Sequence, residues 1–269
     1  MFSSNEELKY INVQKFDTSN VEFMGEMFSN CLNLVSLDLS SFDTSRVIDM
    51  SYMFSNCASL ASLNIKKFDS SSVTNINSMF KSMNNLEYLD ISNLNTENVV
   101  NFKNMFNGCL RLKKLEISKF NTGLAITMDS MFANRGSLTS LILSIFNTQN
   151  VESMNNMLYS VKNLKYINLR IFDTSRVTSM TNMFCGCESL LSLDLNIFNT
   201  EKDTSMFDMF RNDKNLQKLN VKNFDVENCN SFGQIFDQFL NLTLIFGKNN
   251  EKFKILEELF PSYVTIEYV

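Results

Sequence analysis

Residues 34–56 read LVSLDLSSFDTSRVIDMSYMFSN, and the pattern returns every 26 residues along a chain of 269. Apolar residues keep three columns whose members stand 26 positions apart. The first column is Phe16, Phe42, Phe68, Leu94, Phe120, Phe146, Phe172, Phe198 and Phe224. The second is Phe2, Phe28, Phe54, Phe80, Phe106, Phe132, Leu158, Phe184, Phe210 and Phe236. The third is Leu37, Leu63, Leu89, Leu115, Leu141, Ile167, Leu193, Leu219 and Ile245. Chance does not align three columns over most of a chain, so the sequence predicts a solenoid of about ten coils.

Each unit combines a strand signal, a turn and a second apolar segment. Leu37 and Leu39 alternate with polar residues, so we expect them to point inward from a strand. The FDTS run over 42–45 favours a turn, because short polar side chains bond nearby backbone amides. Apolar residues in 47–57 are spaced by three and by one, which favours an extended piece followed by one or two helical turns. The predicted fold class is an α/β-type leucine-rich-repeat solenoid, with a parallel sheet on one face and short extended or helical segments on the other.

We expect the chain to divide into two parts. Residues 1–246 form the solenoid, which begins in the middle of a repeat. Residues 247–269 form a cap, with an amphipathic helix over 250–260 and a last strand over 264–269. A polar-faced cap keeps a solenoid from stacking end to end.

The composition argues against several classes of function. The chain has no His, so Ser–His and Cys–His nucleophiles are impossible and the commonest metal ligand is missing. A net charge of −5 argues against nucleic acid, which needs a basic stripe. No run approaches the roughly 18 apolar residues of a membrane span, so we expect no membrane insertion. The array has no insertion between Phe16 and Phe224 that would build a cleft, so we expect neither an enzyme nor a cofactor.

Methionine and cysteine follow the repeat, which predicts that they fill the core. Nine of the 16 methionines share one column, six share another, and Met83 takes a cysteine position. The cysteines of that column are Cys31, Cys57, Cys109 and Cys187. Three states stay open for the thiols: free and buried, an occasional disulfide between neighbouring coils, or a weak zinc signal at 185–187. We expect free thiols and no metal site.

An acidic or amide side chain recurs at the position of Asp43. The column is Asp17, Asp43, Asp69, Asn95, Asn121, Asn147, Asp173, Asn199 and Asp225. Calcium needs several oxygens converging from one loop, whereas each of these loops offers one such side chain beside a Thr or Ser. Exchange between Asp and Asn favours hydrogen bonding in a turn over calcium binding.

The outward positions of the predicted strands vary where the core columns do not. They are polar and include several tyrosines. Solenoids use such surfaces to bind macromolecules, although the same residues also suit a strand that is merely soluble. The candidate partner contacts are Tyr10, Asp38, Tyr88, Asp90, Lys114, Glu116, Tyr166, Arg170 and Asp194.

The unit LxxLDLSsFDTSxVtxMsyMFsNCxsL, present in 34–60 and again in 164–190, closely resembles the repeat of BspA-like leucine-rich repeat surface proteins in their 26-residue form. The resemblance covers residues 1 to about 246. It implies adhesin-like proteins on the surface of bacteria, with relatives in protists and large DNA viruses, that attach to host matrix proteins or to other cells. It implies no particular site residues, because the family has no defined functional motif.

We therefore expect a non-catalytic scaffold that binds a protein partner through its strands. The resemblance implies a host matrix or cell-surface partner and a cell-surface or secreted location. The first residues show neither the basic nor the apolar segment of a signal peptide, so the alternatives are an intracellular interaction scaffold of the same fold or a piece of a longer protein. A carbohydrate-cleaving solenoid, with clustered carboxylates in one cleft, is a third hypothesis.

Overall fold

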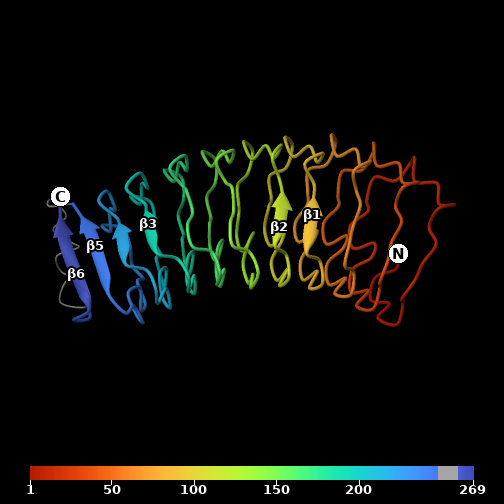
Figure 1. Cartoon of the computed structure of the whole chain (residues 1–269). Coiled ribbons are helices and arrows are strands. Elements are labelled where there is room, and N and C mark those ends of the chain that lie inside the picture. Colours follow the sequence, from red (N-terminus) through yellow and green to blue (C-terminus); the bar gives the residue numbers. More distant parts are fainter. Residues whose placement is uncertain (248–259) are drawn as a thin grey trace.

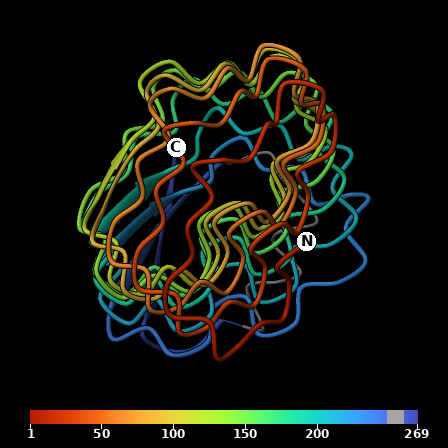
Figure 2. The same cartoon turned by 90° about the vertical axis from the view of Figure 1, so that its right-hand side faces the viewer.

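The chain winds into one gently curved solenoid in the computed structural model, which describes residues 1–247 and 260–269. Successive coils lie side by side from the N-terminus to the C-terminus (Figure 1). Viewed from the end, they superimpose as loops around a common interior (Figure 2). Every strand pairing is parallel, because each coil returns the chain to the same place in the same direction. The predicted solenoid with a parallel sheet is confirmed.

Short strands lie along one side of the solenoid. Their bounds are β1 (Tyr88–Asp90), β2 (Lys114–Glu116), β3 (Ser192–Asp194), β4 (Lys218–Asn220), β5 (Leu242–Phe246) and β6 (Val264–Tyr268). They form two sheets, β1–β2 and β3–β4–β5–β6. The coils between the two sheets carry no strand arrow in Figure 1, so the sheet is interrupted in the middle of the array.

A second line of backbone contacts runs along the opposite part of each coil, where the extended piece near Val47 was predicted. Isolated parallel bridges join residues 26 apart in neighbouring coils. They are Phe23–Asp49, Asp49–Asn75, Asn75–Asn101, Asn101–Thr127, Thr127–Ser153, Ser153–Ser179 and Ser205–Ser231. The extended part of the prediction is confirmed.

The helical turns predicted within 47–57 are wrong, because this segment is a run of tight turns and the described residues contain no helix. The Ser55 N–H donates to the Tyr52 carbonyl at 3.0 Å, across three residues rather than the four of an α-helix. The Phe54 N–H leaves the coil and donates to the Met79 carbonyl of the next one, also at 3.0 Å. Tyr52 has a φ of 55°, which a right-handed helix excludes. We call 47–57 and its counterparts every 26 residues the turn side.

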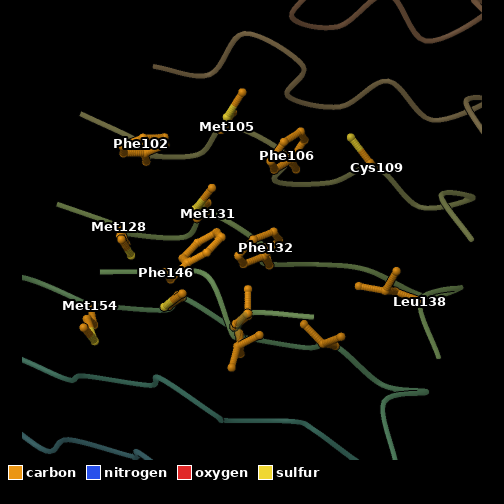
Figure 3. Close-up of a cluster of buried hydrophobic side chains, with 14 of the residues drawn as sticks. Phe102, Met105, Phe106, Cys109, Met128, Met131, Phe132, Leu138, Phe146 and Met154 are labelled. Atoms are coloured by element: carbon orange, nitrogen blue, oxygen red, sulfur yellow. The ribbon is translucent and has the colours of Figure 1, made fainter. Parts of the chain in front are cut away.

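The interior is built from the predicted columns. Phe106 lies beside Phe132 and Met105 lies beside Met131, each pair on neighbouring coils (Figure 3). The two phenylalanine ring centres are 5.8 Å apart with their planes inclined by only 12°. All methionines except Met1 are buried, which confirms that they fill the core.

A buried threonine column joins the coils at the polar turn. Thr96 Oγ1 donates to the carbonyl of Asn121 and accepts its N–H, both at 2.8 Å. The Asn121 side chain accepts the N–H of Gly123 at 3.0 Å and so closes its own turn. The same donation to the next coil is made by Thr18, Thr44, Ser70, Thr122, Thr148, Thr174 and Thr200. The Asp/Asn column therefore forms turns, as predicted.

The last coil departs from the repeat. Leu219 pairs with Leu244, so placing Ile245 in the third apolar column is wrong by one residue. Leu242, Leu244 and Phe246 alternate inward, and this alternation sets the phase of β5. β6 pairs parallel with β5 and confirms the predicted strand over 264–269, and the sheet continues from one into the other. The helix predicted over 250–260 lies outside the described residues except at its last position.

Candidate partner-binding face

The outer surface of the strand positions forms one continuous face, which we call the strand face. Figure 1 views it from outside, with the strand arrows towards the reader. All nine candidate partner contacts lie on it. Its segments are 9–15, 35–41, 61–67, 87–93, 113–119, 139–145, 165–171, 191–197 and 217–223.

Four of the candidate contacts lie together on β1 and β2. The pairing sets Tyr88 beside Lys114 and Asp90 beside Glu116. Lys114 Nζ lies 5.4 Å from the centre of the Tyr88 ring and 2.8 Å from a Glu116 carboxylate oxygen. Hydrogen bonds from the side chain and backbone of Ser92 lower the pKa of Asp90 to about 2. In this group the half-exposed Tyr88 ring lies beside the Lys114 ammonium, which is itself paired with Glu116.

A second group lies three coils further along. Arg170 Nη2 is 3.2 Å from Asp194 Oδ2, and Tyr166 beside them is 63 % exposed. The three residues line a shallow depression between their coils. Tyr10 and Asp38 lie near the other end of the face, and Asp38 accepts a hydrogen bond from Gln14 at 2.9 Å. The structure thus places the predicted residues on one face but not in one cluster.

The sheet opens beside β2. This strand pairs with β1 only, and no strand is formed by the next coil, which is described in full. Leu89 on β1 is fully buried, whereas Leu115 on β2 and Leu141 on the next coil, in the same column, are only partly covered. The opening is a cleft of about 220 Å³ between residues 113–118 and residues from 140 to 145.

An exposed isoleucine ridge beside the cleft was missed by the sequence reasoning. Ile145, Ile171 and Ile197 share one column on three consecutive coils and are 41 %, 49 % and 41 % exposed. Ile142, on the wall of the cleft, is 73 % exposed. The signal was visible, because this column holds Lys, Ser or Asn in the other coils before and after the three isoleucines. Adjoining exposed apolar side chains mark interaction sites more often than single ones do.

The strand face is cationic although the chain as a whole is acidic. Its segments hold 11 Lys or Arg against five Asp or Glu, a net charge of +6, whereas the chain carries −5. All five carboxylates contact side chains of the same face. These pairs are Asp38–Gln14, Glu87–Lys113, Asp90–Lys66, Glu116–Lys114 and Asp194–Arg170. The lysines that make no ion pair within the described part of the chain are Lys9, Lys15, Lys67, Lys119, Lys165, Lys218 and Lys222.

Three ionisable residues stand in core columns instead. Arg135 and Asp213 occupy the cysteine column, and Asp203 occupies the column of Val47. All three are fully buried. The three nitrogens of the Arg135 side chain and Oδ2 of each aspartate have no hydrogen-bond partner among the described residues.

Burial shifts the pKa of each of these groups towards its neutral form. It raises the pKa of Asp203 to about 7, raises that of Asp213 well above its usual value, and lowers that of Arg135 to about 10. The Arg135 guanidinium lies 5.2 Å and 5.3 Å from the centres of the Phe106 and Phe132 rings. Because these side chains face the interior, they offer no contact to a partner, and we expect them to affect stability.

The cysteines are the remaining candidates for chemistry. All six cysteines, each within the described residues, are free and buried. Burial raises the pKa of the Cys57 thiol to about 12 and keeps it protonated at neutral pH. Across 1–247 and 260–269, no three His, Cys, Asp or Glu side chains are grouped as ligands for a metal ion. Nor does that part of the chain contain a helix with the length and apolar character needed to cross a membrane.

A family model matches the repeats of this chain. It describes a "Mycoplasma protein of unknown function, DUF285" and matches residues 1–88, 78–168 and 160–260. Together these three segments cover nearly the whole chain. No curated protein and no solved structure matches it.

Proposed function

The chain belongs to the family described as Mycoplasma protein of unknown function, DUF285, and from its repeat architecture we propose that it is a non-catalytic scaffold that binds a protein partner through the strand face. The resemblance of its repeat to BspA-like surface proteins supports an adhesin-like form of this function. In that form the protein acts at the cell surface or after secretion, and its partner is a host matrix or cell-surface protein.

The observation that carries the proposal is the contrast between a uniform interior and a varied outer face. The core columns repeat from coil to coil, whereas the strand face presents exposed tyrosines, an isoleucine ridge and a cleft. Solenoids bind macromolecules on extended surfaces of this kind. Tyrosines such as Tyr10 and Tyr166 are the type of side chain that anchors protein interfaces.

The charges argue against a carbohydrate-cleaving solenoid. Such an enzyme needs two nearby carboxyl groups at a cleft, one of them with a raised pKa that lets it donate a proton. On the strand face the pKa of Asp90 is lowered by its hydrogen bonds, and contact with Lys113 lowers that of Glu87. The raised pKa values belong to Asp203 and Asp213, which no substrate in solution reaches.

Binding measurements on immobilised protein test the proposal. We expect saturable binding of at least one of fibronectin, laminin and collagen by surface plasmon resonance, and its loss in the double variant Tyr88→Ser/Tyr166→Ser. The matched control is Phe207→Ser, which removes an exposed aromatic ring outside the strand face and should bind normally. If none of the three proteins binds, or if the double variant binds as well as the unmodified chain, the proposal is contradicted.

A further inference from the structure

We propose that the partner segment held by the strand face is acidic and carries an apolar side chain that enters the cleft beside β2. This inference rests on the proposed function and adds the chemistry of the partner. It is drawn from three features of the face: its charge, its unpaired lysines and the apolar opening in its sheet.

The charge of the face selects for acidic partners. A surface of net charge +6 on a chain of net charge −5 attracts acidic segments to this face and repels basic ones. The carboxylates of the face already contact Lys, Arg or Gln side chains of the same chain, so they offer little to a basic partner. Lys119 and Lys165, in contrast, make no ion pair among the described residues and lie on the coils before and after that of Ile142.

The opening beside β2 supplies an apolar socket between these cations. Its apolar lining is Leu115, Ile117 and Leu141 with the exposed Ile142 and Ile145. Its charged lining is Lys113, Lys114 and Glu116, in which the Glu116 carboxylate is paired with Lys114. An aliphatic or aromatic side chain placed there would cover leucines that the interrupted sheet leaves partly exposed. Burying such a side chain contributes roughly 2 kcal/mol when the fit is complete.

The combination favours a protein segment over other polyanions. An anionic polysaccharide could pair its acidic groups with the lysines of the face, but it has no apolar group to fill the cleft. Single-stranded nucleic acid is held by aromatic side chains on which its bases stack. None of the residues that line this cleft is aromatic, and the face of the Tyr88 ring is covered by Lys114. A protein segment with glutamate or aspartate beside a leucine or phenylalanine matches both the positive charge of the face and the apolar lining of the cleft.

Fluorescence anisotropy with labelled synthetic peptides tests the inference on the whole chain. The probe is an extended peptide of glutamates with one central leucine. One matched peptide has serine in place of the leucine, and another has lysines in place of the glutamates. Heparin and single-stranded DNA are the competing polyanions. We expect the Glu–Leu peptide to bind roughly ten-fold more tightly than the serine peptide and to weaken as salt rises.

Variants of the face locate the binding. We expect the affinity for the Glu–Leu peptide to fall roughly ten-fold in the double variant Lys119→Glu/Lys165→Glu and also in Ile142→Ser. The matched controls are Lys202→Glu, at an exposed lysine outside the face, and Ile126→Ser, at an exposed isoleucine on another side, and both should leave binding unchanged.

Four results would overturn the inference. Equal binding of the Glu–Leu and serine peptides, or displacement of the probe by heparin or DNA with no loss in Ile142→Ser, would indicate a general anion surface. Tighter binding of the lysine peptide, lost in Ile142→Ser, would leave the proposed function standing and refute the charge argument. Failure of every peptide while a matrix protein still binds through Tyr88 and Tyr166 would separate the two proposals in the same way.

Discussion

The turn side and the strand face extend along the same coils but differ in regularity. On the turn side the same backbone bonds recur along the array: Phe54 donates to the Met79 carbonyl, and Phe80 donates to the Met105 carbonyl one coil later. On the strand face the sheet is broken into two pieces and its leucines are covered to different extents. The turn side and the core therefore hold the solenoid together, which leaves the strand face free to vary.

The largest expected effect comes from removing one ring of the phenylalanine stack. Phe106 is fully buried and lies 5.7 Å and 5.8 Å, centre to centre, from the rings of Phe80 and Phe132. We expect Phe106→Ala to lower the unfolding free energy by about 3–5 kcal/mol, because it leaves a cavity inside a close-packed column. Ile142→Ala on the strand face should change it by less than about 0.5 kcal/mol. Urea unfolding followed by circular dichroism measures both free energies. Equal losses in the two variants would contradict the claim that the core, and not the strand face, holds the solenoid together.

The second effect depends on pH and comes from Asp203. Its folded pKa of about 7 exceeds the ordinary 3.8, so the folded state keeps a proton that the unfolded state releases between these values. The contribution of this carboxyl to the unfolding free energy is fully present below pH 4 and is lost as the pH rises through 7. We expect Asp203→Val, which restores the residue of the column, to raise the unfolding free energy by up to about 4 kcal/mol at pH 8. The gain should shrink steadily towards pH 4, and a gain that is constant between these pH values would show that the carboxyl is not buried.

A third, smaller effect is expected at Arg135. The buried guanidinium has no hydrogen-bond partner among the described residues. The ring faces of Phe106 and Phe132 compensate only part of the cost of burying its charge. Met83 fills the same column two coils earlier. We expect Arg135→Met to raise the unfolding free energy by about 2 kcal/mol, because it removes a desolvated charge. Arg135→Lys keeps the charge and is the control, and a loss of stability in Arg135→Met would show that the arginine is solvated.

The smallest effect tests the turns. Asn56 has a φ of 59°, and its Nδ2 donates to Asn30 Oδ1 at 2.6 Å. We expect Asn56→Ala to cost about 1 kcal/mol, because alanine tolerates left-handed backbone poorly. Asn56→Gly should cost less, since glycine adopts this conformation freely. Midpoints of urea unfolding compare the two, and an equal loss in both variants would assign the role to the side-chain hydrogen bond, which both substitutions remove.

The repeat spacing and the core columns could be predicted from the sequence, because inward-facing apolar residues recur at a fixed spacing. The helical turns of 47–57 could not be excluded by periodicity, since a run of tight turns buries Met50, Met53 and Phe54 at the same spacing as a helix. The distinguishing signal was the Asn, Ser or Gly at positions such as Asn30 and Gly108, where the backbone is left-handed.

The candidate face could be located from the sequence, but its details could not. Alternation identified the outward side of each strand and thus residues such as Tyr166 and Arg170. The opening beside β2 depends on how far two neighbouring coils separate, and no residue of 113–118 or 140–145 encodes that distance. The isoleucine ridge was predictable from its column, in which isoleucine replaces Lys, Ser or Asn in three consecutive coils.

The threonine column has a consequence for how such a gene changes length. The hydroxyls of Thr96 and its counterparts bond to the adjoining coil, so each unit meets a copy of the same interface above and below. Duplicating or excising one whole repeat would rejoin matching surfaces. A single-codon insertion, in contrast, would shift the donors of one coil out of register with the acceptors of the next. Unequal recombination between repeats could therefore lengthen or shorten the molecule while preserving its architecture, and each event would add or remove a strip of outer surface for selection to act on.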